Sequence, residues 1–267
     1  MRIREPAPAK LNLALHVRRK RADGYHELET VFAFCTDGDL LSAEAADTFS
    51  LSVEGPFADA LSGEEDNLVL KAARALAEAS GVTLGADLRL RKNLPVASGI
   101  GGGSADAAAA LRLLTRLWSI DPSHAAAVAP ALGADVPACL LSMTARGEGS
   151  GDQLELVDVG VAGKPVLLVN PLEGLSTAAV FARWDGQDRG SLDDWREGRN
   201  DLQEPAEALC PAVGDVIAWL SGQSGADLTR MSGSGATCFA LFEDEGARDR
   251  AAAACPQEWW NLPTFLR

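Results

Sequence analysis

Apolar and polar positions alternate near the start of the chain, which predicts a β-strand over residues 3–17. One face of this strand carries Leu11, Leu13 and Leu15, and the other carries Lys10, Asn12 and Ala14. We expect Pro6 and Pro8 to interrupt the strand, since proline cannot donate to a sheet ladder. A lysine and an asparagine on a polar face are either solvated or directed at a ligand, and periodicity alone favours exposed Lys10 and Asn12.

The same reading predicts mixed strands and helices along the rest of the chain. Strands are expected at 29–34, 40–53, 87–94, 154–159, 166–170 and 238–242, with a turn at 37–39. Helices are expected at 67–80, 104–118, 122–132, 213–221 and 245–255, with others starting near Ser176 and Asn200. Either Asp66 or Asn67 can cap the first helix, and Gly81 ends it.

Residues 146–152 have the composition of a linker, because glycine and charged residues dominate them. We therefore place a domain boundary there, between an N-terminal part (1–152) and a C-terminal part (153–267). A chain of 267 residues is long enough for two modest domains.

A glycine-rich stretch lies between the strand predicted at 87–94 and the helix predicted at 104–118. It reads Pro95, Val96, Ala97, Ser98, Gly99, Ile100, Gly101, Gly102, Gly103, Ser104, Ala105. Glycines let the backbone approach a ligand closely, and a helix N-terminus offers unpaired N–H groups to an anion. The plainer interpretation is a tight turn with Ser104 as a helix cap. The number of glycines favours a phosphate site.

The sequence of this stretch does not match the glycine-rich loops of other nucleotide-binding classes. A Walker A loop would need a lysine after Gly103, where Ser104 stands. A dinucleotide fingerprint that begins at Gly99 would need a glycine at position 104. A protein-kinase glycine loop joins two strands, whereas this one opens a helix.

Composition argues against several other classes of function. The formal net charge is −14, which argues against a nucleic-acid partner because such a protein needs a basic face. The five cysteines are widely spaced and include no CxxC pair, so neither a disulfide framework nor a zinc site is indicated. The first residues lack the apolar core of a signal peptide, and no apolar run reaches the length of a membrane span. We expect a cytoplasmic protein that binds no membrane.

Three further polar features have ordinary structural explanations when each is taken alone. Asp135 stands where a helix cap belongs, just before Pro137. Tyr25 and His26 follow a basic turn at 18–24, which is typical of a solvated hairpin. A second Gly/Ser loop, residues 231–237, precedes an apolar strand and is by itself a weak signal.

Taken together, three segments in order resemble the GHMP superfamily of small-molecule kinases. They are Pro8-Ala-Lys-Leu-Asn-Leu13, Pro95-x₃-Gly-Ile-Gly-Gly-Gly-Ser104 and Met231-Ser-Gly-Ser-Gly-Ala236. Residues 22–26, 133–137 and 200–202 are most similar to members whose acceptor is linked to a cytidine diphosphate. The resemblance implies an α+β, two-domain fold with a ribosomal-S5-like N-terminal domain and a ferredoxin-like C-terminal domain.

The resemblance also implies that ATP donates its γ-phosphate to an alcohol, with Lys10 and Asp135 as the catalytic pair. ATP would then contact Asn67 and the whole stretch from Pro95 to Ala105. The acceptor would contact Asn12, Tyr25, His26, Thr177 and Phe181, with Tyr25 and Phe181 stacking on the base. Ala105 departs from a serine common in family loops, and Ser98 from a common glycine.

No carboxylate cage for a metal is visible in the sequence, so we expect Mg²⁺ to be held mainly through the nucleotide. The expected partner is a small molecule, and the protein is expected to be a monomer or a weak homodimer. Alternatives are a kinase acting on homoserine or mevalonate, and a silent sugar-nucleotide sensor on the same fold. A nicotinamide oxidoreductase is the weakest alternative.

Overall fold

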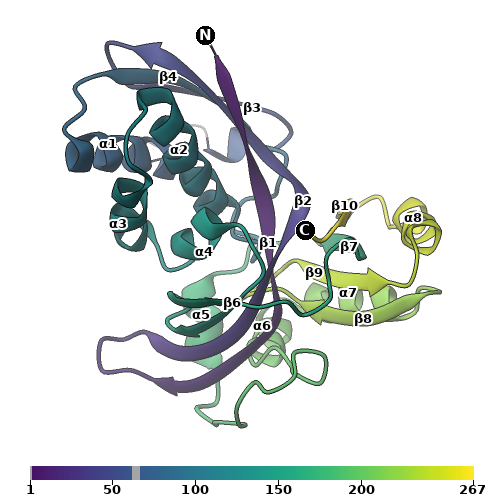
Figure 1. The fold of residues 1–267 in the computed structure, drawn as a ribbon. Coiled ribbons are helices and arrows are strands. Elements are labelled where there is room, and N and C mark those ends of the chain that lie inside the picture. The colour runs from purple at the N-terminus through teal and green to yellow at the C-terminus, as the bar shows by residue number, and fades with distance from the viewer. Residues whose placement is uncertain (1, 62–66) are drawn as a thin grey trace. The chain divides into compact units, whose positions relative to one another are not determined.

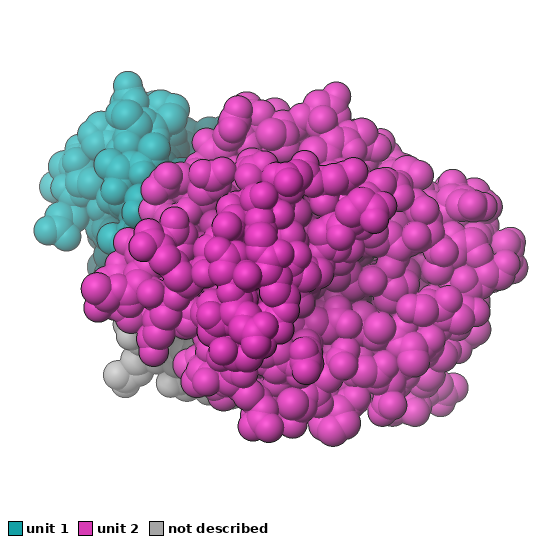
Figure 2. All heavy atoms as spheres, turned by 90° about the horizontal axis from the view of Figure 1, so that it is seen from below, with its two compact units in different colours: residues 1–9, 37–96, 101–142 teal, residues 10–36, 97–100, 143–267 magenta. Residues whose placement is uncertain are grey.

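A computed structural model describes residues 2–61 and 67–267. The chain forms two compact units, coloured separately in Figure 2. Unit 1 comprises residues 1–9, 37–96 and 101–142, and unit 2 comprises residues 10–36, 97–100 and 143–267. Strands β1 (Ile3–Lys20) and β2 (His26–Ala46) each contribute to both units.

The sheet of unit 1 is built from the second half of β2 with β4 (Gly85–Arg91) and β3 (Ser50–Glu54). Strand β4 lies between the others, antiparallel to β2 and parallel to β3. The single turn η1 (Asp59–Leu61) follows β3. Strand β4 confirms the strand predicted at 87–94, and it leads into the glycine-rich stretch.

Four helices of unit 1 pack on one another: α1 (Leu68–Ser80), α2 (Gly102–Trp118), α3 (Pro122–Leu132) and α4 (Val136–Leu141) (Figure 1). Asn67 caps α1 by accepting a hydrogen bond from the Val69 amide, and Gly81 ends it in a left-handed conformation, as predicted. Asp66, the other candidate cap, lies outside the described residues. Alanines line much of the buried face of α2, which lets the neighbouring helices approach closely.

Unit 2 contains two groups of strands. The first half of β2 pairs with β1 and with β5 (Ala145–Gly149), and β5 pairs with β6 (Gln153–Leu156). A separate antiparallel sheet has the order β10-β7-β9-β8, formed by β7 (Pro165–Asn170), β8 (Ala226–Met231), β9 (Cys238–Phe242) and β10 (Trp260–Phe265).

The helices of unit 2 are α5 (Thr177–Arg183), α6 (Gln203–Leu209), α7 (Ala212–Ser221) and α8 (Glu245–Ala254). Helices α7 and α8 pack against β7, β8 and β9. Alternate residues of β7 and β9, including Leu167, Val169 and Phe242, join Val216 of α7 in one buried cluster. In the part of the chain that the structure describes, no helix has the length and apolar character needed to span a bilayer.

Several predictions made from the sequence are wrong in detail. Strand β1 runs through Pro6 and Pro8 without interruption. Residues 146–149 of the expected linker belong to β5, which is paired on both sides. The domain boundary near residue 152 stays a prediction, and the compact units group residues 10–36 and 97–100 with residues 143–267. The assignment of ATP binding to 1–152 and substrate binding to 153–267 stays a prediction.

The turn expected at 37–39 is also wrong, because these residues continue β2. Gly38 is required there by a close approach of two backbones. A Cβ added to Gly38 would lie 2.1 Å from the Ala7 carbonyl oxygen and 2.7 Å from the Pro8 Cα. Backbone atoms cannot move aside as a flexible side chain can, so only glycine fits.

We expect Gly38→Ala to lower the free energy of unfolding by about 2–3 kcal/mol, because the added methyl group overlaps backbone. Urea denaturation measures this change. Gly174→Ala is the matched control, since a Cβ there meets nothing within 4 Å. Equal stability of the two variants would contradict the prediction.

Candidate active site

The glycine-rich stretch is divided between the two units. Residues 97–100 belong to unit 2, while Pro95, Val96 and the residues from Gly101 onward belong to unit 1. Each part is therefore described with the residues of its own unit.

In unit 1 the stretch ends as the N-terminus of α2. Gly101 is the N-cap, in a left-handed conformation with φ 65°, and no side chain caps the helix. Ser104 lies inside the first turn, so its interpretation as the cap is wrong. The first N–H groups of an α-helix lack acceptors within the helix, and together with the macrodipole they favour an anion.

Gly102 and Gly103 occupy the first turn of α2, where glycine is a poor helix former. A Cβ added to Gly103 would meet nothing within 4 Å, and its φ is not positive. Neither packing nor backbone conformation within the protein therefore requires glycine at position 103. A bare backbone at an open helix N-terminus is what close contact with a phosphate needs.

In unit 2, residues 97–100 are held by the Gly/Ser loop at 231–237. The Thr237 amide donates to the Ser98 carbonyl (3.1 Å), and the Ser232 hydroxyl donates to the Gly99 carbonyl (3.0 Å). A Cβ on Gly99 would lie 2.5 Å from the Ser232 carbonyl oxygen and 2.6 Å from that of Gly235. The two glycine-containing segments are thus packed backbone to backbone.

Strand β1 completes this arrangement. The Lys10 amide donates to the Ile100 carbonyl (3.0 Å), and the Asn12 amide donates to the Ser232 hydroxyl (3.2 Å). Parts of the three sequence segments that carried the family resemblance therefore meet in unit 2, through backbone hydrogen bonds and through the Ser232 hydroxyl.

The side chains of Lys10 and Asn12 are buried, contrary to the prediction from periodicity. The Lys10 Nζ donates to the Asn12 Oδ1 (2.8 Å) and lies 5.4 Å above the Phe32 ring. The Asn12 Nδ2 donates to the Thr30 Oγ1 (2.8 Å), which in turn donates to the Ala14 carbonyl. These contacts fix the position of the Lys10 ammonium group.

The sequence reading missed two buried asparagines that support the loop at 231–237. The Asn200 Nδ2 donates to the carbonyls of Met231 and Gly233, both at 2.8 Å. The Asn170 Nδ2 donates to the Thr237 Oγ1 (2.8 Å). The only available signal at position 170 was one polar residue at the end of an apolar strand, and Asn200 was noted only as part of a family motif.

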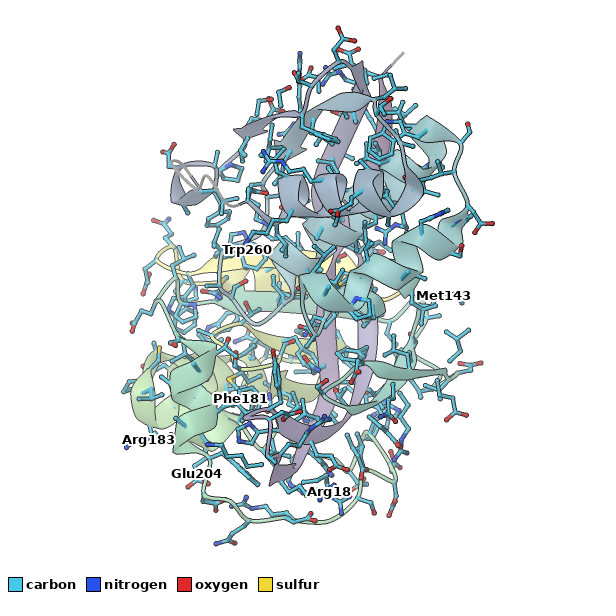
Figure 3. The ribbon with its side chains drawn as sticks, turned by 90° about the vertical axis from the view of Figure 1, so that its left-hand side faces the viewer. Arg18, Met143, Phe181, Arg183, Glu204 and Trp260 are labelled. Carbon is cyan, nitrogen blue, oxygen red and sulfur yellow. The ribbon has the colours of Figure 1, made fainter. Side chains whose placement is uncertain are left out.

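The predicted acceptor residues lie in unit 2. His26 stacks on Phe181, with ring centroids 4.8 Å apart, and meets Trp184 edge-on. Phe181 of α5 is half-buried against the apolar cluster of unit 2, whereas Arg183 is exposed and projects outward (Figure 3). Burial lowers the pKa of His26, and the charge of Lys20 adds to this effect. The imidazole is therefore mainly neutral at pH 7 and can both donate and accept hydrogen bonds.

Two other residues predicted to contact the acceptor, Tyr25 and Thr177, lie close in sequence to His26 and Phe181. Tyr25 is 62% exposed at the tip of the turn between β1 and β2. Thr177 is the first residue of α5, and its hydroxyl lies 2.8 Å from the Ser234 hydroxyl of the loop at 231–237. Whether these residues contact an acceptor stays a prediction.

The remaining candidates, Asp135 and Asn67, belong to unit 1. Asp135 directly precedes α4, but its side chain makes no capping hydrogen bond, so the capping interpretation is wrong. Its carboxylate is not used to satisfy the helix. The Asn67 Oδ1 is used as the cap of α1.

Comparison with known proteins agrees with this arrangement. The model of the GHMP kinase N-terminal domain matches residues 67–143, and that of the GHMP kinase C-terminal domain matches residues 182–261. The chain therefore belongs to the GHMP kinases.

Relatives at high identity narrow the class. The 4-diphosphocytidyl-2-C-methyl-D-erythritol kinase of Rhizorhabdus wittichii is 53% identical, over 98% of this chain and 94% of the relative. The kinase of the same description from Novosphingobium aromaticivorans is 51% identical, over 100% of this chain and 94% of the relative. Within the GHMP kinases, the chain belongs to the 4-diphosphocytidyl-2-C-methyl-D-erythritol kinase family.

Solved structures give the same result. A 4-(cytidine 5'-diphospho)-2C-methyl-D-erythritol kinase superposes with a TM-score of 0.85 at 32% identity, covering 99% of both chains. A homoserine kinase from Cytophaga hutchinsonii superposes with a TM-score of 0.72 at 17% identity, covering 99% of this chain and 95% of that one, and shares the fold alone. The predicted two-domain GHMP fold is confirmed.

We expect Ser232→Ala to lower the free energy of unfolding by about 1–3 kcal/mol, because it removes the hydroxyl that accepts from the Asn12 amide and donates to the Gly99 carbonyl. Ser80→Ala is the control, since that hydroxyl only adds to a helix carbonyl that is already bonded. Thermal and urea unfolding measure both variants. An effect at Ser232 no larger than at Ser80 would contradict the role assigned to this hydroxyl.

Proposed function

We propose that the chain transfers the γ-phosphate of ATP to the 2-hydroxyl of 4-diphosphocytidyl-2-C-methyl-D-erythritol, a step in non-mevalonate isoprenoid precursor synthesis. The names of its relatives, which are about half identical over nearly the whole chain, support this substrate. The observation in the structure that best supports phosphate binding is the unobstructed Gly103 backbone at the N-terminus of α2, which no side chain caps.

In this proposal the ATP phosphates bind along the stretch from Pro95 to Ala105, and Asn67 contacts the adenine. Among the described residues, no group of three or more His, Cys, Asp or Glu side chains is placed to hold a metal ion. We propose that the Mg²⁺ ion is carried mainly by the phosphate oxygens of the nucleotide. The ion would neutralise charge on the phosphates as transfer proceeds.

Lys10 and Asp135 are the proposed catalytic pair. Asp135 orients the acceptor hydroxyl and takes up its proton as the oxygen bonds to the γ-phosphorus and the bond to the ADP oxygen breaks. The Lys10 ammonium offsets the negative charge on the phosphoryl group. A loose transition state needs positioning more than a strong base, so orientation is the main role of Asp135.

Asn12 holds Lys10 in place through the hydrogen bond between their side chains, which supports a positioning role beside its predicted contact with the acceptor. For the cytosine ring, we propose that Tyr25 and Phe181 supply aromatic faces and that His26 bonds the edge of the base. Thr177 would contact the rest of the acceptor.

We expect Gly103→Ala to raise the KM for ATP roughly tenfold or more, because a methyl group would occupy the place of a phosphate oxygen. Stability should stay equal or rise by up to about 1 kcal/mol, since alanine is the better helix former. Gly214→Ala, in the first turn of α7, is the matched control because its Cβ would make only ordinary contacts. An unchanged KM for ATP at position 103 would contradict phosphate binding there.

The acceptor is tested by ADP release with Mg²⁺-ATP and three compounds: 4-diphosphocytidyl-2-C-methyl-D-erythritol, mevalonate and homoserine. We expect turnover with the cytidyl compound only. Asp135→Asn should lower kcat by roughly a hundred- to ten-thousand-fold. Tyr25→Ala should act mainly on the KM of the acceptor, by roughly tenfold, because it removes one stacking face.

The other outcomes separate the alternatives. Turnover with mevalonate or homoserine would keep the kinase and discard the cytosine subsite. Binding of ATP without turnover on any acceptor would favour the sensor.

A further inference from the structure

A buried cluster of charges in unit 1 joins Asp39 of β2, Lys92 directly after β4 and Asp106 of α2. The Lys92 ammonium lies 2.5 Å from the Asp39 Oδ2 and 2.7 Å from the Asp106 Oδ2. The side chains of Lys92, Asp39 and Asp106 are exposed by 2%, 0% and 4%. None of them has a role in the proposed transfer step.

This cluster holds the glycine-rich stretch from both ends. On the strand side, the Asp39 Oδ1 accepts hydrogen bonds from the amides of Asn93 (2.5 Å) and Leu94 (2.9 Å), just before Pro95. On the helix side, Asp106 lies four residues after Gly102, which is about 6 Å along the helix axis. A Cβ on Gly102 would lie 3.1 Å from the Lys92 Nζ, so the cluster is directly beneath the start of α2.

The two carboxylates are not equivalent. Asp39 accepts from three donors, which suits an ionised carboxylate. Asp106 accepts from Lys92 and also faces the Asp39 carboxylate, while its buried Oδ1 has no hydrogen-bond partner among the described residues. Burial, with the charge of Asp39, raises the pKa of Asp106 to about 7, although Lys92 opposes this shift.

Among the described residues, the helices packed on α2 bring no buried charged side chain to this site. The buried residues of α1 and α3 are apolar, and those of α4 are Val136, Ala138 and the thiol Cys139. Further along α2, Arg112 and Arg116 both pair with Glu5. The cluster is therefore neutral when Asp106 is protonated and carries one negative charge when it is ionised.

We propose that Asp106 is a positioning residue of the nucleotide loop whose protonation is coupled to nucleotide binding, so that the protein takes up a proton at Asp106 when the phosphates bind. The inference rests on the proposed ATP site at the start of α2. Phosphate charge placed above a negative cluster is unfavourable, and protonation of Asp106 removes that repulsion. Each unit by which bound phosphate raises the pKa of Asp106 corresponds to a tenfold loss of affinity at pH values well above it.

The test is calorimetric titration of Mg²⁺-ADP into the whole protein at about pH 8, in HEPES and in Tris, which differ in ionisation enthalpy. For the wild-type chain we expect an apparent binding enthalpy that depends on the buffer in the direction of proton uptake. Asp106→Asn keeps the shape of the side chain and makes the cluster permanently neutral. We expect it to abolish the buffer dependence and to bind Mg²⁺-ADP several-fold more tightly than wild type.

Asp47→Asn removes one negative charge from an exposed position of the same unit and should behave as wild type. A KM for ATP that rises between about pH 6 and pH 8 in wild type but stays flat in Asp106→Asn would support the same conclusion. Binding with equal enthalpy in both buffers, or proton uptake that persists in Asp106→Asn, would overturn the inference. Failure of wild type to bind Mg²⁺-ADP at all would instead overturn the proposed nucleotide site.

Discussion

The close approach of two backbone segments in unit 2 determines where most of the candidate groups lie. Gly99 lies against the carbonyls of Ser232 and Gly235 at distances that leave no room for a Cβ. Because the two segments are so close, the Ser232 hydroxyl reaches both the Gly99 carbonyl and the Asn12 amide. Strand β1 is thereby tied to both loops, and Lys10 is set on that strand.

This arrangement explains why short segments far apart in the sequence act as one recognisable pattern. Each segment supplies main-chain groups that bond to groups of the others. A change in one segment therefore leaves polar groups of another without their hydrogen-bond partners. Asn170 and Asn200 extend the same network from β7 and from the start of the α6 region. The rigidity of the site therefore comes from hydrogen bonds between backbone segments, supported by amide side chains.

Local signals predicted much of the fold. The predicted cap and stop placed α1 well, because Asn67 and Gly81 act through neighbouring backbone. The glycine-rich stretch and its exit helix were also predicted, since both depend on local composition. Contacts distant in sequence were not predictable in this way. The local sequence predicts a turn at Gly38. It cannot show that glycine is required by the Ala7 carbonyl, which lies about thirty residues away in the chain.

The prediction that Lys10 and Asn12 are exposed is wrong for a similar reason. Alternation separates two faces of a strand, but it cannot show that both faces are covered, as they are in β1. The buried ion cluster of Lys92, Asp39 and Asp106 gave no sequence signal at all, because its members come from three elements. The candidate site was found mainly from its motifs, and the residues that support it were found from the structure.

The acidic composition of the chain has a consequence for how it meets its substrates. A protein with a net charge of −14 repels nucleotides at long range, while its attraction for phosphate comes from dipoles and amines that act only at short range. Dissolved salt screens the long-range repulsion far more than the short-range attraction. Encounter with anionic ligands should therefore become faster as ionic strength rises, the reverse of the behaviour of proteins that attract such ligands with a basic surface.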